Sequence, residues 1–477
     1  MHIPTSSRRT ARALALGVAS AALLSVASAR QASIDWTNVQ AETIRHYRGL
    51  VQIDTSNPPG NEIKAVEYLQ KVLTAEGIPS KILALDPNRP NLVARLKGNG
   101  SKRPLLLLAH TDTVGVQREK WPVDPFGAVQ RDGFIWGRGT TDDKDNLAAN
   151  LIAFLLVKRS GARLDRDLIF LAESGEEADP TGVGIRFVVE RHFEEIDAEF
   201  ALAEGPGARI EDGRVRRVQI TTTEKVPRRV RLVATGTSGH GSIPRLDNAV
   251  THLAGAVQKI ATWEMPTRLS ETTRSYFEKL AAISPPDRAA RYRSLLAPNG
   301  SAASERYLAE HEPEHYAILR TTLVPTMLQA GIGPNVIPST AEAVIDIRAL
   351  PDEDVPRMMD EIVKRIADPA VSVVPLPSPR PVAKPSPIDS TMYRVLEAAA
   401  AKVYPGATAL PSMMTAASDM AQLRAKGVQA YGIGPAMTSA DFAQHGWHSD
   451  VERLPEDSLH QFVRFVWTAV VDAVVSK

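Results

Sequence analysis

The chain has 477 residues, of which 43% are hydrophobic and 23% charged, and its formal net charge is +1. This composition is typical of a soluble globular protein, and the length is sufficient for two domains. The chain contains no cysteine, which excludes disulfides, thiolate ligands and a cysteine nucleophile, so a metal site must use His, Asp and Glu.

The first 29 residues have the pattern of a signal peptide. Arg8, Arg9 and Arg12 precede an apolar run over residues 13–26, and residues 27–29 match a small-residue cleavage site. The run is too short for a membrane anchor, so we expect cleavage and a periplasmic or secreted protein, exported by either the Sec or the twin-arginine route. Without this segment 53 basic residues face 55 acidic ones, a balance that favours neither a nucleic-acid nor a membrane partner.

The first part of the chain alternates helical and strand patterns. Helices are predicted over residues 36–50, 65–76 and 146–158, strands over 82–85, 92–96, 105–109, 168–172 and 200–203, and a long loop over 121–139. Several of the strands run directly into acidic residues. This pattern predicts a mostly parallel α/β sheet with one site along its carboxyl edge.

After residue 225 the pattern changes to that of a smaller α+β domain. Strands are predicted over residues 230–235, 323–330, 341–349 and 371–374, and helices over 248–263 and 355–366, which is a ferredoxin-like order. Residues 266–320 form an extra helical insertion, and the six prolines of residues 375–387 form a linker back. Helices over 392–403 and 459–475 and a strand over 430–433 then rejoin the first part. We therefore predict a catalytic domain over 30–225 and 381–477, with a lid or dimerisation domain over 226–380.

Acidic residues and histidines gather where the predicted strands end. A carboxylate placed just before a helix, Asp142, could bridge two cations, and the adjacent Glu176 and Glu177 point in different directions, so that one can bind metal while the other takes a proton from water. With a second imidazole, these groups would complete a site for two zinc ions. The candidate residues up to this point are His110, Asp112, Asp142, Glu176, Glu177 and Glu204.

Seven motifs in order carry a resemblance to a known family. They are HTDTV, GRGTTDDKDN, ESGEE, AEGP, SGHGSIPR, PNVIPSTAEAVIDIRALP and HSDVERL, beginning at His110 and ending at Leu454. Together they resemble the zinc-dependent exopeptidase and deacylase family of glutamate carboxypeptidase, peptidase V, aminoacylase, acetylornithine deacetylase and succinyl-diaminopimelate desuccinylase. The similarity extends over almost all of the chain that follows the signal peptide.

The resemblance implies a role for each candidate residue. It implies one zinc on His110 and Glu204, a second on Glu177 and a late histidine, and Asp142 between them, with Co²⁺ or Mn²⁺ as substitutes. Glu176 would be the general base, and Asp112 would fix the tautomer of His110. The late histidine is His448 rather than His445, because the family has a histidine four residues before a Glu-Arg pair.

The resemblance also implies roles for the inserted domain. His240 would stabilise the oxyanion, often from a partner subunit, while Asn335 and Arg348 would bind substrate, Arg348 by gripping a free carboxylate. Ser418-Asp419 stands where many members have Thr-Asp, and Asp143 is expected to be structural. Asp145 departs from the family, which has glycine there, and the long insertion leaves dimerisation open.

The leading hypothesis is a dizinc hydrolase that cleaves an amide bond adjacent to a free carboxylate. A metallo-carboxypeptidase or dipeptidase acting on peptides is preferred, with an N-acyl amino acid deacylase as the alternative. A non-catalytic binding relative would have lost Glu176 or a ligand, and none is lost. A serine hydrolase is disfavoured because the sequence has no G-x-S-x-G motif. The sequence leaves open the substrate side chain, the native metal and the oligomeric state, a homodimer through the inserted domain included.

Overall fold

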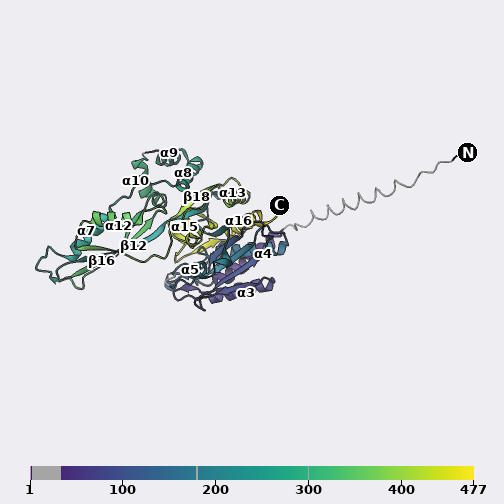
Figure 1. The fold of residues 1–477 in the computed structure, drawn as a ribbon, viewed down its shortest axis with the longest axis horizontal. Helices are drawn as coiled ribbons and strands as arrows, with labels where there is room; N and C mark the ends of the chain where they lie inside the picture. The colour runs from purple at the N-terminus through teal and green to yellow at the C-terminus, as the bar shows by residue number, and fades with distance from the viewer. Residues whose placement is uncertain (1, 3–33, 179–180, 299, 477) are drawn as a thin grey trace.

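The computed structural model describes residues 2, 34–178, 181–298 and 300–476 (Figure 1). The predicted signal peptide falls outside these residues, apart from His2. Among the helices described, none is long and apolar enough to cross a membrane.

A ten-stranded mixed sheet forms the core of the larger unit (Figure 1). The pairs β8–β4, β4–β9 and β9–β19 at its centre are parallel, whereas β2–β3 and β3–β8 at one edge are antiparallel. The predicted α/β fold with a largely parallel central sheet is therefore confirmed. The strands in spatial order are β2 (Ser80–Leu83), β3 (Asn91–Leu96), β8 (Leu168–Glu173), β4 (Leu105–His110), β9 (Phe200–Glu204), β19 (Gln429–Ile433), β11 (Arg214–Glu224), β10 (Ala208–Glu211) and β20 (Ala436–Thr438), with β18 (Thr408–Met414) also paired to β11.

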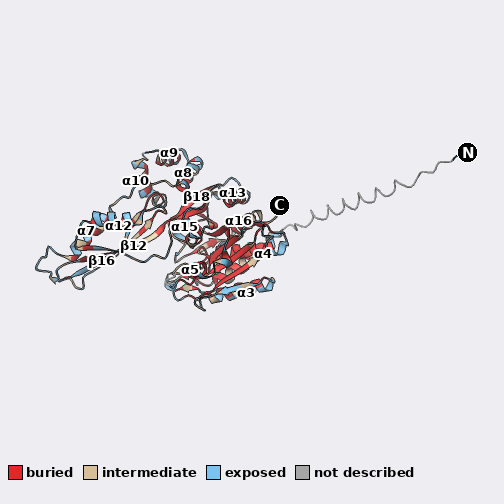
Figure 2. Cartoon of the chain, viewed as in Figure 1, coloured by how far each residue is buried: buried red, intermediate tan, exposed pale blue. Residues whose placement is uncertain are grey.

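Both faces of this sheet are covered, which explains the continuous leucine run of β4. Leu105 and Leu107 pack into the core beneath one layer of helices, whereas Leu106 and Leu108 pack into the core on the other face. All six residues of β4 are buried, and the interior of the larger unit is almost uniformly buried in Figure 2. One layer contains α2 (Trp36–Val51), α3 (Ile63–Ala75), α4 (Lys144–Ser160), α13 (Thr391–Val403) and α16 (Glu456–Val474); the other contains α5 (Ile185–Arg191), α6 (Phe193–Ile196) and α14 (Met420–Ala425).

The smaller unit contains a four-stranded antiparallel sheet in the order β14–β16–β12–β17. Helices α7 and α12 pack on one face, and β12 alternates buried and more exposed residues because its other face is open to solvent. The order strand-helix-strand-strand-helix-strand is the ferredoxin-like one. Its elements are β12 (Val226–Thr235), α7 (Ala249–Ala261), β14 (Thr322–Ala330), β16 (Thr340–Ala349), α12 (Val355–Ile366) and β17 (Val371–Pro375), with a separate ribbon of β13 (Gly239–His240) and β15 (Val336–Ile337).

The helical insertion connects the two units. Its apolar side chains share one core with Leu350 of the smaller unit and with Leu410 and Met413 of β18, and Figure 1 shows it lying between and above the two sheets. Ser270 caps the first helix in a capping box with Thr273. The insertion contains α8 (Glu271–Ile283), α9 (Pro286–Leu295), α10 (Ala302–His311) and α11 (Pro313–Ala317).

The prediction of a long loop over residues 121–139 is wrong. This segment contains β6 (Val129–Arg131) and β7 (Phe134–Trp136), joined by an Asp132-Gly133 turn in which both residues have positive φ, as a tight hairpin requires. The third strand of this sheet, β21 (Arg453–Pro455), lies more than 300 residues later, a pairing that no local pattern reveals. The remaining short elements are β1 (Ser56–Asn57), β5 (Thr113–Val114), a 3-10 helix (Arg118–Lys120) and α15 (Ser439–His445).

Candidate metal centre

The predicted ligands meet at the carboxyl ends of the three central strands of the large sheet. β4 ends at His110, β9 ends at Glu204, and the turn after β8 carries Glu176 and Glu177. Glu176, Glu177 and Glu204 line a cleft of about 880 Å³, which is bordered on the other side by Arg229 and Arg348 of the smaller unit. The location is the one at which open α/β sheets bind ligands.

Asp142 lies between the two histidines. Its Oδ1 is 3.1 Å from Nε2 of His110, and its Oδ2 is 3.2 Å from Nε2 of His448. On either side, Glu204 Oε2 lies 3.9 Å from His110 Nε2, and Glu177 Oε2 lies 3.0 Å from His448 Nε2. Each histidine therefore faces one oxygen of the shared Asp142 and one further carboxylate.

The alternative histidine lies elsewhere. His445 Nδ1 is 3.0 Å from the carbonyl oxygen of Val451, and the ring packs edge-on against Trp136. His448 adopts a left-handed φ of 63°, a conformation that is uncommon outside glycine, although histidine is among the residues enriched in it. This turn presents its ring to Asp142 and Glu177.

The charges of these groups depend on one another. Burial raises the pKa of Glu176 to about 8, and burial together with the charge of Asp142 raises that of Glu177 to about 7. Hydrogen bonds to Asp142 and Glu177 raise the pKa of His448 to about 10. Without a metal ion, bound protons therefore offset the negative charge of the carboxylates. A bound cation would replace these protons, because it favours neutral imidazole and ionised carboxylates.

The donor set fits two divalent ions. Ligand atoms bound tetrahedrally to one zinc ion at ~2.0–2.2 Å lie about 3.3–3.6 Å apart, and the distances above, 3.0 to 3.9 Å, lie around that range. Two groups of ligand atoms, one from His110, Asp142 and Glu177 and one from His110, Glu176 and Glu204, each lie within 4.8 Å of one another. These side chains would hold the ions.

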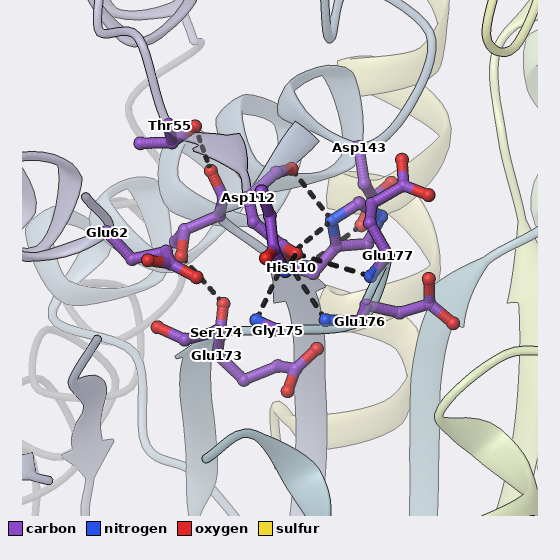
Figure 3. Close-up of polar contacts among 12 residues, drawn as sticks. Thr55, Glu62, His110, Asp112, Asp143, Glu173, Ser174, Gly175, Glu176 and Glu177 are labelled. Carbon is purple, nitrogen blue, oxygen red and sulfur yellow. Dashed lines mark hydrogen bonds and ion pairs between the residues drawn. The ribbon is translucent and has the colours of Figure 1, made fainter. Parts of the chain in front are cut away.

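Asp112 anchors the turn that carries the base and a ligand (Figure 3). Its carboxylate accepts hydrogen bonds from the backbone N–H groups of Gly175, Glu176 and Glu177, at 3.0 to 3.2 Å. Toward His110, the Nδ1 atom is 3.1 Å from the backbone oxygen of Asp112 and 3.5 Å from its carboxylate. The nearest contact of His110 Nδ1 is therefore with the backbone oxygen of Asp112 and not with the carboxylate predicted from the sequence, and the anchoring of the turn is additional.

Glu452 has a role that sequence reasoning left unassigned. It is fully buried, forms an ion pair with Arg138 at 2.7 Å and accepts hydrogen bonds from the backbone of Gly139 and Thr141. It therefore ties the loop of His448 to the loop of Asp142. The expected structural role of Asp143 agrees with its position, because its Oδ2 accepts from the backbone N–H of His110 at 3.2 Å.

Arg380, in the proline-rich linker, was also missed. Its guanidinium donates to Glu176 Oε1 through Nη2 and to Asp419 Oδ1 at 2.9 Å through Nη1, and it lines the cleft. Ser418 instead hydrogen-bonds Glu224. A basic residue of the linker thus fixes one oxygen of the predicted general base.

Of the three site residues predicted on the smaller unit, one lines the cleft and two do not. Arg348 lines the cleft, with its Nε donating to Asp346 at 2.8 Å. His240 and Asn335 lie beside one another on the β13–β15 ribbon, where the Gly241 N–H donates to the Asn335 carbonyl at 2.8 Å. Both are exposed and neither lines the cleft, so the structure does not bring them to the metal ligands.

Comparison with known proteins agrees with this geometry. A sequence profile of the Peptidase family M20/M25/M40 matches residues 106–472. The chain belongs to this family. The resemblance predicted from the motifs is thereby confirmed, and as an M20 protein the chain is a metallohydrolase.

Two relatives are similar in sequence to part of the chain. The N-fatty-acyl-amino acid synthase/hydrolase PM20D1 of Bos taurus is 29% identical over 324 residues, which are 65% of this chain and 63% of that protein. A probable succinyl-diaminopimelate desuccinylase of Staphylococcus epidermidis is 37% identical over 145 residues, 30% of this chain and 35% of that protein. The chain thus spans less than two thirds of the length of these relatives.

The structural matches are more complete and more distant in sequence. The M20 family metallo-carboxypeptidase Sso-CP2 from Sulfolobus solfataricus has a TM-score of 0.68 at 18% identity, covering 90% of this chain and 98% of that one. The Bacillus subtilis YXEP protein, a dinuclear metal binding peptidase of the M20 family, has a TM-score of 0.59 at 16% identity, covering 92% and 99%. Because the sequence identities are this low, the two structures support the fold of the chain and nothing more specific.

Proposed function

We propose that this M20 protein is a dizinc hydrolase that cleaves the amide bond of N-acyl amino acids. The observation that carries the proposal is Asp142, whose two oxygens face two histidines beside Glu176, across the cleft from the cationic Arg348. One relative is named an N-fatty-acyl-amino acid synthase/hydrolase and the other a probable succinyl-diaminopimelate desuccinylase. These names support the acyl class over the peptides favoured by the sequence alone.

The proposed ligands are His110 and Glu204 for one ion, Glu177 and His448 for the other, and Asp142 for both. When bound, two zinc ions lower the pKa of water and polarise the scissile carbonyl. Co²⁺ or Mn²⁺ would be accepted by the same nitrogen and oxygen donors.

The chain's own residues would bind the substrate and move the protons. Arg348 grips the free carboxylate by a bidentate contact. Glu176 accepts a proton from the attacking water and returns it to the leaving amine, while Arg380 keeps one of its oxygens in place. His240 would donate to the developing oxyanion once the β13–β15 ribbon reaches the cleft, either by closure of the smaller unit or from a partner subunit.

A carboxypeptidase or dipeptidase is the second candidate. The same cleft, at about 880 Å³, has room for a dipeptide, and Arg348 would bind a C-terminal carboxylate equally well. The two candidates differ in the group on the acyl side, which is an acyl chain without an amine in one and an amino acid or peptide in the other.

One experiment separates these functions. The protein from Arg30 onward would be loaded with zinc or treated with chelator and given N-acyl amino acids, dipeptides and longer peptides. We expect chelator-sensitive hydrolysis with a higher kcat/KM for N-acyl amino acids, and a KM increase of about tenfold or more in Arg348→Gln. Arg357→Gln is the matched control, because Arg357 is an exposed arginine on α12 of the same unit and does not line the cleft. Hydrolysis of peptides alone would favour the second candidate, and absence of bound metal would overturn both.

Location and assembly are part of the proposal. The signal-peptide pattern supports export to the periplasm or the medium. A homodimer through the smaller unit is supported by the edge strand β14, on which Met327 and Leu328 are 64% and 66% exposed. Light scattering of the wild type and of Leu328→Asp would test it, because the charge should shift a dimer to monomer.

A further inference from the structure

A second pocket adjoins the metal cleft on the side of the helical insertion. Its volume is about 70 Å³, room for a few water molecules at the ~10–15 Å³ that each requires, and hence for a carboxyl group with a short stem. Met414, Thr415 and Trp447 line both the pocket and the cleft. Trp447 directly precedes His448, so the shared wall lies next to the metal centre.

The pocket contains a buried cation, Arg209 of β10. The residue is 5% exposed, and its guanidinium lies over the Phe442 ring at 4.1 Å. Nη1 donates to the backbone carbonyls of Pro206 and Ala208, whereas Nε and Nη2 have no hydrogen-bond partner among residues 34–178, 181–298 and 300–476. Burial lowers the pKa of Arg209 to about 10, so that the group remains protonated at neutral pH.

Arg209 differs from every other buried arginine in the described part of the chain. Five others are buried, and each forms an ion pair with a glutamate at 2.6 to 3.0 Å; Arg209 has no carboxylate within 4.0 Å. The five pairs are Arg89–Glu62, Arg138–Glu452, Arg166–Glu199, Arg320–Glu305 and Arg424–Glu224. Because a buried unpaired charge is costly, an anion in the pocket would supply the missing partner.

The other polar groups of the pocket suit an anion. Gln219, Ser412 and Thr415 line it with neutral hydrogen-bonding side chains. His315 is held by Glu312 and by the Tyr276 hydroxyl. The one lining carboxylate is that of Glu314, which is exposed on the insertion and lies beyond ion-pair distance of Arg209.

We propose that this pocket is a carboxylate subsite, so that the preferred substrate carries a second carboxylate besides the one bound by Arg348. The Nε and Nη2 groups of Arg209 offer the parallel N–H pair that a carboxylate accepts. The second carboxylate could end a dicarboxylic acyl group or the side chain of an acidic amino acid. Its assignment to the substrate rests on the function proposed above; the binding of a carboxylate at Arg209 does not.

The binding of a carboxylate at Arg209 is tested on metal-free protein, so that the measurement does not depend on catalysis. Calorimetry would compare glutarate with butyrate on the wild type, on Arg209→Gln and on Gln219→Glu, which places a carboxylate inside the pocket. We expect glutarate to bind at least tenfold more tightly than butyrate, and both variants to lose that preference. Arg216→Gln is the matched control, because Arg216 lies on the neighbouring strand β11, pairs with Asp212 and does not line the pocket.

An unchanged preference in both variants would overturn the subsite. If Arg209→Gln fails to fold, as judged by its melting curve, Gln219→Glu decides alone, because it leaves the arginine and its stacking on Phe442 intact.

Hydrolysis then identifies the source of the carboxylate. N-glutaryl-leucine is compared with N-valeryl-leucine, and N-acetylglutamate with N-acetylglutamine. A preference of tenfold or more for the acid in the first pair places it on the acyl side, and in the second pair on the amino acid; Gln219→Glu should abolish it. Hydrolysis of all four without preference would contradict the subsite and leave the proposed function standing. No hydrolysis, with Arg209-dependent glutarate binding, would contradict the function and leave the subsite standing.

Discussion

The carboxyl edge of the large sheet and the β13–β15 ribbon of the smaller unit both carry residues predicted to act on one substrate, and they differ in burial. At the sheet edge His110 is 2% exposed. Asp112 and Glu452 are fully buried, and their carboxylates accept hydrogen bonds from backbone N–H groups. On the ribbon, His240 and Asn335 are exposed, and within the described ranges His240 Nδ1 hydrogen-bonds only Ser242 of its own turn. The first region is completed by its own chain, whereas the second requires a further surface.

The largest expected effect is on the sheet edge. Glu176→Gln should lower kcat by about 10²–10⁴-fold, because the general base is lost, while two metal ions remain bound. Glu177→Gln is the contrasting variant and should lose metal. Metal analysis of both proteins beside steady-state kinetics tests this; loss of metal from Glu176→Gln would show that Glu176 is a ligand instead.

The ribbon should show a large kinetic effect without a stability effect. We expect His240→Ala to lower kcat by about 10²–10³-fold, the range for an oxyanion donor, and to leave the melting temperature unchanged because the side chain is exposed. His252, which pairs with Asp368 in the same unit, is the control: His252→Gln should affect melting more than kcat. Full activity in His240→Ala would mean that the ribbon never reaches the cleft.

Removing the anchor of the turn should reduce metal binding. Asp112→Ala leaves three backbone N–H groups without their acceptor, and we expect metal affinity to fall about 10- to 100-fold, as for other groups that orient ligands. Competition with a chromogenic chelator measures this. Asp54→Ala removes a carboxylate whose hydrogen bonds, among the residues that the structure describes, go to Ser56 of its own turn, and it should leave the affinity unchanged.

The protonation of His448 should have a smaller effect on metal affinity. The pKa of His448, about 10 against an ordinary 6.5, is raised by Asp142 and Glu177, so the protonated ring stabilises the metal-free fold most below pH 6.5 and this contribution fades toward pH 10. Metal binding requires the neutral ring, so affinity should rise with pH, by at most about tenfold per unit for each proton released. Calorimetry in buffers of different ionisation enthalpy would count the protons; none released would contradict the assignment of His448.

The sheet edge was predictable because its signals are local. An apolar run that stops at His110, or at Glu173 before Glu176 and Glu177, marks both a buried strand and the chemistry at its end. The strands β10, β11, β18 and β20 were missed, because β11 is rich in arginine and threonine and its partners β18 and β19 lie roughly 190 to 210 residues later in the chain. The Asp132-Gly133 turn is a hairpin signal in the sequence, but the three-residue strands on either side are too short for their sequence pattern to predict the hairpin.

The contacts of single charged residues were not predictable. Arg380 stands among prolines in a linker, and only folding places it against Glu176. The same holds for Arg209, which differs from the other buried arginines solely in the partner that it lacks. Sequence patterns specify which residues are buried together along an element, whereas ion pairs between distant segments depend on tertiary packing.

The insertion also changes how the smaller unit can move. The chain passes between the units near Lys225 and again through the linker, and the insertion adds a third attachment through Leu410 and Met413 of β18. Two attachments permit both swinging and twisting of the smaller unit, and the third restricts these motions. An approach of the ribbon to the cleft must therefore deform the contacts of the insertion with β18 or come from a second copy of the chain.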